Sequence, residues 1–228
     1  MTSVAKVASG VAAASTASAG GIYFGTDLFK SSNLPKKEKV SSLLKTTNPE
    51  RRLITSKELS DSHWKTTWKL YIERERSKSV EKDIWGLNGW SKPTSDVQLE
   101  DAIQSFIDAC SSKKDLEVVD ANDDLYKQVL DFCTRETLVK DLVSETSGKT
   151  SLVGTDDSAG WNNAWKAYKD SHSGKDGTDT WTINNWSTEK NNTNAPQAFK
   201  DECGKKLETK TWDKKHADYV NFIGWCTK

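Results

Sequence analysis

Large apolar residues recur at helical spacing along most of the chain. Trp64, Trp68 and Tyr71 are separated by four and three residues, which places them on one face of a helix. The apolar residues of segment 99–110 have similar spacing and follow a Ser-x-x-Gln capping box at 95–98. A third helix is expected to begin at Asp123 or at the residue after it. The pattern therefore predicts a small unit of three helices.

The same pattern occurs twice in the chain. Copies of W-x-x-x-W-K-x-Y begin at Trp64 and Trp161, and copies of W-x-x-x-x-W-S begin at Trp85 and Trp181. Two F-x-D-x-C motifs follow, and the distance between copies changes only between motifs, from 97 to 96 to 93 residues. Such changes are expected where insertions and deletions fall in loops. Self-similarity of this kind predicts a duplicated structural unit.

We therefore predict an all-α fold with two tandem copies of a Trp- and Cys-containing three-helix unit behind an N-terminal hydrophobic anchor helix. The predicted parts are a signal anchor or signal peptide at 1–30, a polar linker at 31–56, repeat unit 1 at 57–135, a connector at 136–156 and repeat unit 2 at 157–228. The stretches around the W-S motifs fit a helix less well, and short extended segments are an alternative there.

The N-terminal segment is a separate element. Residues 7–26 contain no charged residue, and about 20 helical residues match the hydrocarbon core of a bilayer. We predict an uncleaved signal anchor that holds the chain in the cell membrane, with the rest on the extracellular face. A cleaved signal peptide with an Ala-Ser-Ala site at 17–19 is the alternative and would give a secreted protein. A flexible Ala/Ser/Gly tail is a further alternative.

All four cysteines lie in the repeated pattern. Cys110 and Cys133 are 23 residues apart, and so are Cys203 and Cys226. Because a repeat that folds by itself should carry its own bridge, we predict the disulfides Cys110–Cys133 and Cys203–Cys226. Buried, reduced cysteines are the alternative. Disulfides would agree with an exported protein.

Composition adds two points. The chain has 33 basic and 33 acidic residues, and this balance argues against a nucleic-acid-binding protein. It also has ten Trp in 228 residues, a residue that serves cores and binding faces. We expect the Trp at helical spacing to lie in the core. Trp85, Trp90, Trp181 and Trp186, in the less regular stretches, are the candidates for exposed aromatics that bind a partner.

The sequence contains no phosphate-binding loop, nucleophile elbow or calcium loop. The histidines, His63, His172 and His216, are scattered and do not form a helical metal pair. The acidic pairs near residues 123 and 156 precede predicted helices, where carboxylates stabilise the N-terminal end. We therefore predict no catalytic site, no cofactor and no metal.

The order of these features resembles the paralogous surface-protein families of haemotropic mycoplasmas. An Ala/Ser/Gly-rich anchor precedes a polar connector, and W-x-x-x-W-K-x-Y, W-S and paired Cys motifs follow, so the resemblance covers essentially the whole chain. It implies a surface antigen of a wall-less bacterial parasite of red cells, displayed for antigenic variation or for contact with host proteins or glycans. No functional residue is carried over. An exported hydrolase with a site between the two units, and a purely structural surface scaffold, are the alternatives.

Overall fold

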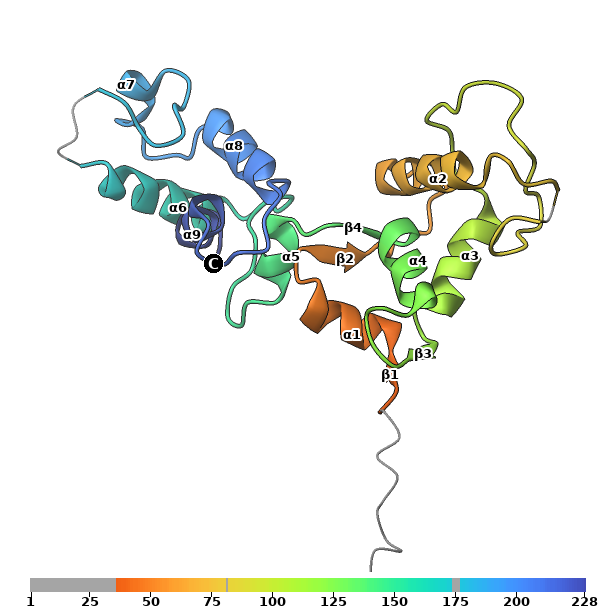
Figure 1. Ribbon diagram of the computed structural model, residues 1–228. Coiled ribbons are helices and arrows are strands. Elements are labelled where there is room, and N and C mark those ends of the chain that lie inside the picture. The colour runs from red at the N-terminus through yellow and green to blue at the C-terminus, as the bar shows by residue number, and fades with distance from the viewer. Residues whose placement is uncertain (1–35, 81, 174–176) are drawn as a thin grey trace, which may run out of the picture. The chain divides into compact units, whose positions relative to one another are not determined.

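The computed structural model describes residues 36–80, 82–173 and 177–228 (Figure 1). The predicted anchor at 7–26 lies outside these residues. Among the described residues, no helix is both long enough and apolar enough to cross a bilayer.

Helices dominate the described part of the chain, with a few short strands between them (Figure 1). The first half contains α1 (Val40–Thr47), α2 (Ser62–Glu75), α3 (Gln104–Lys113) and α4 (Asp124–Phe132). The second half contains α5 (Val139–Ser144), α6 (Ser158–Ser171), α7 (Trp186–Glu189), α8 (Gln197–Leu207) and α9 (Ala217–Trp225). Strand β1 (Glu38–Lys39) pairs with β3 (Glu117–Val118), and β2 (Arg51–Leu53) pairs with β4 (Thr134–Glu136), both antiparallel.

The two halves have the same backbone frame. Four matched hydrogen bonds show this: Val40 N–H to Leu116 O (3.0 Å) and Ile54 N–H to Cys133 O (3.0 Å) in the first half, and Val139 N–H to Thr209 O (2.9 Å) and Leu152 N–H to Cys226 O (2.9 Å) in the second. The bridges Leu138–Lys210 and Ser151–Thr227 stand where the first half has its two strand pairs. We define repeat 1 as residues 36–136 and repeat 2 as residues 137–228.

Each repeat is therefore longer at its N-terminal end than predicted. The described part of the expected linker at 31–56 contains α1 and β2, and the expected connector at 136–156 contains α5. Many residues of both segments are polar, which favours a linker. A few buried apolar side chains, such as Val40 of α1 and Val139 of α5, are nevertheless enough to attach each short helix to its core. The repeated unit thus has four matched helices rather than three.

Carboxylates fix the starts of the longest helices. The Asp61 side chain accepts the backbone N–H of His63 at 2.8 Å at the start of α2, and Asp157 accepts the N–H of Gly160 at 2.8 Å at the start of α6. The capping box predicted at 95–98 does not start a helix, because α3 begins at Gln104. The residues before it are held in another conformation, in which Ala102 N–H donates to Leu59 O at 3.0 Å.

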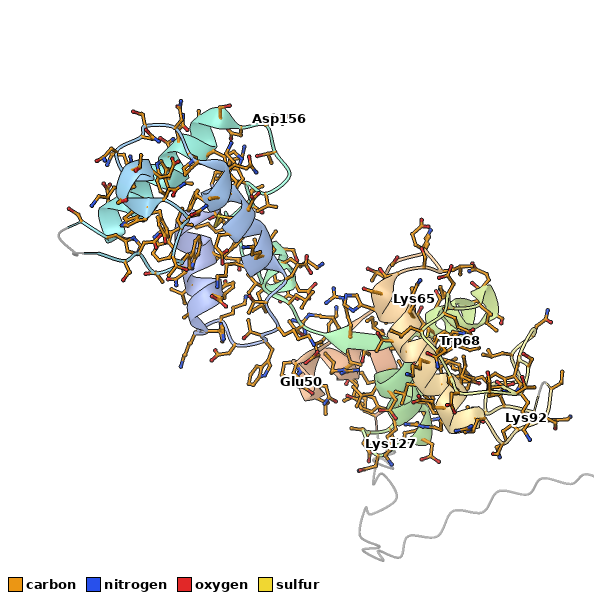
Figure 2. All side chains as sticks on the ribbon, turned by 90° about the horizontal axis from the view of Figure 1, so that it is seen from above. Glu50, Lys65, Trp68, Lys92, Lys127 and Asp156 are labelled. Atoms are coloured by element: carbon orange, nitrogen blue, oxygen red, sulfur yellow. A yellow bond between two sulfur atoms is a disulfide. The ribbon has the colours of Figure 1, made fainter. Side chains whose placement is uncertain are left out.

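A separate aromatic core fills each repeat. In repeat 1, Trp68 stacks on Tyr71 with ring centroids 5.7 Å apart. Figure 2 labels Trp68, which lies buried in this core. In repeat 2, Trp165 stacks on Tyr168, also at 5.7 Å. These residues occupy the core face that the helical pattern predicts.

Candidate functional site

A buried disulfide joins the last two long helices of each repeat. Cys110 of α3 is bonded to Cys133 after α4, and Cys203 of α8 is bonded to Cys226 after α9, with S–S distances of 2.03 and 1.98 Å. The pairing predicted from the sequence is confirmed. All four cysteines are buried, so the bridges stabilise the fold and are shielded from reagents in solvent.

The four Trp proposed as partner-binding aromatics pack inward instead. Trp90 and Trp181 are only 2% and 7% exposed, and Trp85 and Trp186 are half-buried. Trp85 stacks on Phe106 with ring centroids 5.7 Å apart. The expectation of an exposed aromatic face is therefore wrong for Trp90 and Trp181, because their loops fold back over the core.

In the loops that carry Trp85 and Trp181, a buried hydrogen bond between Tyr and Asp accounts for the inward packing. In repeat 2, the Tyr168 hydroxyl donates to Asp179 Oδ2 at 2.7 Å, and Asp179 Oδ1 accepts the N–H of Ile183 at 3.0 Å. In repeat 1, the Tyr71 hydroxyl donates to Asp83, which also accepts the N–H of the residue four positions later. We call residues 83–87 and 179–183 the Tyr–Asp loops. Each carboxylate holds its loop against the core, and the Trp at its third position is carried inward.

The environment of each tyrosine favours its neutral form. Burial, and then the hydrogen bond to Asp179, raise the pKa of Tyr168 far above its ordinary value. Burial and Asp83 do the same to the pKa of Tyr71. The tyrosines therefore act as permanent donors and the aspartates as acceptors near neutral pH.

The sequence carries a signal for these loops that the repeat comparison passed over. Both have the form Asp-x-Trp-x-Leu/Ile, and the two Asp match between copies. Two further positions also match in conformation. Gly86 and Thr182 have φ of 59° and 51°, and Gly89 and Asn185 have φ of 85° and 58°. The left-handed conformation suits Gly and Asn, but it is strained for the β-branched Thr182.

Different side chains hold the second residue of each Tyr–Asp loop. Glu75 Oε2 accepts the N–H of Ile84 at 2.9 Å, and His172 Nε2 accepts the N–H of Thr180 at 2.9 Å. Because Nδ1 of His172 lies 2.7 Å from a backbone carbonyl, the proton is assigned to Nδ1. Both buried groups are thus engaged in holding the loop.

The same groove lies over the first tryptophan of each repeat. In repeat 1 it has a volume of about 330 Å³ and is lined by Trp64, Ile107 and Lys57. In repeat 2 the matching groove measures about 460 Å³ and is lined by Trp161 and Lys200, whose ammonium lies 5.6 Å from the Trp161 ring centroid. The two grooves share the tryptophan that lines them, but the side chains at their edges, which we call the groove rims, differ. The copies have therefore diverged at this surface.

A third groove, of about 500 Å³, runs along α2 past His63. Burial, and then the positive charge of Arg135, lower the pKa of His63. Most charged side chains around it are already paired: Arg135 with Asp141 at 2.7 Å, Lys69 with Glu73 at 3.7 Å, and Asp131 with Arg74 at 2.8 Å. The Arg51 side chain instead donates a hydrogen bond to Thr134 Oγ1 at 2.8 Å. The groove thus has a neutral imidazole among groups that serve structural ion pairs.

One tryptophan of the described part is mostly exposed. Trp212, between α8 and α9, is 55% exposed, and it lies outside the eight Trp of the repeated motifs.

Within the described ranges, side chains of His, Cys, Asp and Glu do not gather into groups of three or more that could hold a metal ion. No protein family, curated protein or solved structure matches the chain.

Proposed function

We propose that this chain is an externally displayed binding protein, held at the cell membrane through residues 7–26. The observation that carries the proposal is the buried disulfide in each repeat, with the same 23-residue separation in both. Disulfides form and persist in oxidising compartments and are rare in the cytosol. Duplicated bridges of this kind suit a small domain that must remain folded outside the cell.

The use of the polar groups supports binding rather than catalysis. Within the described residues, the buried acidic and histidine side chains, Glu75, Asp83, His172 and Asp179, all accept backbone N–H groups of the Tyr–Asp loops. These polar groups therefore stabilise the fold. Differences between the repeats also occur at the groove rims and in exposed loops, where partners are recognised. Host proteins or glycans are the partners that the resemblance to mycoplasma surface proteins suggests.

Protease treatment of intact cells tests the location. We expect an external protease to remove the described region, and an antibody to residues 36–228 to lose its signal without cell lysis. Protection until lysis would contradict display. A cytosolic protein of the same cells serves as the control for integrity.

The anchor is tested by fractionation and mass spectrometry. A retained anchor predicts that the chain sediments with membranes and yields a peptide from residues 7–26. Release into the medium with a new N-terminus after residue 19 would favour the secreted alternative. Peptides prepared without reductant should show Cys110 linked to Cys133.

Binding is tested with the full chain immobilised and exposed to host plasma and to red-cell membranes. We expect saturable capture of a defined component, and the Trp212→Ala variant separates binding at that surface from binding elsewhere. Failure to capture anything from either source would favour the structural scaffold.

A further inference from the structure

The connection between the last two long helices carries an exposed apolar residue at the same position in both repeats. Val119 follows α3 and is 43% exposed, and Trp212 follows α8 and is 55% exposed. The positions correspond because each lies three residues after a matched carbonyl, that of Leu116 or of Thr209, in the shared backbone frame. Both side chains are therefore presented by equivalent backbone.

The two connections have opposite charge. We call residues 115–124 the acidic loop and the matching residues 208–217 the basic loop. The acidic loop has five carboxylates and no basic residue, and the basic loop has three lysines against two carboxylates, Glu208 and Asp213. The carboxylates of the acidic loop are Asp115, Glu117, Asp120, Asp123 and Asp124, and the lysines of the basic loop are Lys210, Lys214 and Lys215.

Several of these charges have no partner within the fold. Over the described ranges, Lys214 and Lys215 are exposed and join no ion pair, and the same holds for Glu117. Asp124 comes only within 3.9 Å of Lys127, with its side chain 92% exposed. Asp123, by contrast, caps α4. The fold thus leaves carboxylates free on the acidic loop, and on the basic loop it leaves Lys214 and Lys215 free beside Asp213, which is exposed and, over the described ranges, also joins no ion pair.

We propose that the basic loop of one molecule binds the acidic loop of a second copy of this chain. Trp212 would pack against Val119 and the 49%-exposed Leu116, with Lys214 and Lys215 facing the carboxylates. A central aromatic anchor within a ring of complementary charge is the usual composition of a specific contact.

The charge pattern also sets the direction of association. Two acidic loops, or two basic loops, repel each other, so only unlike loops pair. Such a head-to-tail contact joins different surfaces of the two molecules, and it leaves one free loop of each kind. Repetition therefore gives a chain or a closed ring of molecules rather than a simple two-fold dimer. The inference concerns the folded repeats and does not depend on where the protein is located.

Sedimentation of the full chain, with every variant in the same detergent, tests the proposal. We expect the average mass of the wild type to rise with protein concentration and to fall as salt is raised from about 0.05 M to about 0.5 M. Lys214→Glu/Lys215→Glu should raise the dissociation constant at least tenfold. A matched control, Lys78→Glu/Lys149→Glu, makes the same change in net charge at two exposed lysines outside both loops and should associate like the wild type.

A complementary swap makes the test specific to the two loops. Glu117→Lys/Asp124→Lys should also weaken association at least tenfold. Mixed in equal amounts, this variant and Lys214→Glu/Lys215→Glu should associate again, because the unchanged basic loop of the first can bind the unchanged acidic loop of the second. Circular dichroism of each variant checks that it is folded. Any association through the N-terminal segment is the same in all variants, so it does not affect the comparison.

Trp212→Ala gives a further measurement without a change of charge, and we expect at least a tenfold weaker association. The proposal is overturned if the mixture associates no more than its separate components. It is also overturned if both charge reversals leave the wild-type mass unchanged.

Discussion

The hydroxyl of Tyr168 donates to Asp179 Oδ2 at 2.7 Å inside the core of repeat 2. Through this contact, an aspartate holds the loop that carries Trp181. Tyr168→Phe removes a donor from a buried carboxylate, so we expect the free energy of unfolding to fall by about 1–3 kcal/mol. Urea denaturation measures the change.

Tyr219→Phe is the matched control for this variant. Its hydroxyl contacts Thr146 at 2.7 Å, and Thr146 retains another partner, the Leu142 carbonyl at 2.7 Å. We therefore expect a smaller loss than for Tyr168→Phe. Equal losses in the free energy of unfolding would show that the buried carboxylate does not increase the contribution of the Tyr168 hydrogen bond.

The raised pKa values of Tyr71 and Tyr168 predict a loss of stability at alkaline pH. In the unfolded chain, Tyr loses its proton near pH 10, whereas in the folded chain both hydroxyls stay protonated to higher pH. The stability that they contribute is complete below about pH 10 and falls as pH rises beyond it. Thermal unfolding between about pH 8 and pH 11 should show a steeper decline for the wild type than for Tyr71→Phe/Tyr168→Phe. Parallel declines would contradict the assignment, since the titration of lysines is common to both proteins.

Removing one bridge should weaken its own repeat. Cys203→Ala/Cys226→Ala reopens a loop of 23 residues, and the chain-entropy estimate for such a loop is about 3 kcal/mol. Hydrogen exchange should speed up in α8 and α9, with repeat 1 unchanged. A general increase in exchange across both repeats would mean that the repeats do not keep separate cores.

Substitution of two tryptophans distinguishes a core side chain from a surface side chain. Trp64 is 2% exposed, and Trp64→Ala should lower the free energy of unfolding by about 3–5 kcal/mol, because it leaves a cavity. Trp212→Ala should change it by no more than about 0.5 kcal/mol. Chemical denaturation of both variants checks the contrast, and a large loss for Trp212→Ala would place this side chain in the core.

The matched loop positions suggest a stabilising substitution. Thr182 holds a φ of 51° where repeat 1 has Gly86, and relief of this strain offsets the greater freedom of Gly in the unfolded chain. We expect Thr182→Gly to raise stability by about 1 kcal/mol, and Gly86→Thr to lower it by a similar amount. Melting temperatures that moved in the opposite directions would show that the backbone at these sites is not strained.

The helical pattern and the cysteine pairing could be predicted from the sequence because both are local and both occur twice. Trp64, Trp68 and Tyr71 reveal a helix face by their spacing alone. The equal separation of the two Cys pairs favours one connectivity over the others. Helix α1 could not be found in this way, because its place depends on a backbone pairing with residue 116, about 75 residues away.

The direction of side chains in irregular segments was harder to predict. Neither Trp90 nor Trp181 belongs to a periodic apolar pattern that would indicate which way its side chain points. The sequence is therefore compatible with a position in the core or on a binding face. Asp179 of the Tyr–Asp loop decides the matter for Trp181, and it matches Asp83 of the other copy, but a lone Asp suggests an exposed position. The acidic and basic loops escaped notice for the opposite reason. They share a backbone frame but only one identical residue, Asp120 in one loop and Asp213 in the other, and a comparison that looks for identity passes over them.

The second repeat begins at the residue after the first one ends, and each contains both halves of its own disulfide. Recombination between the two copies in the coding DNA, at any matched position, would therefore remove or add one whole repeat length. A crossover could also fall between the two cysteines of a repeat. The product would then pair the first cysteine of one copy, such as Cys110, with the second cysteine of the other copy, such as Cys226. Chains of different length could arise in a single genetic step, and none of them would be left with an odd thiol.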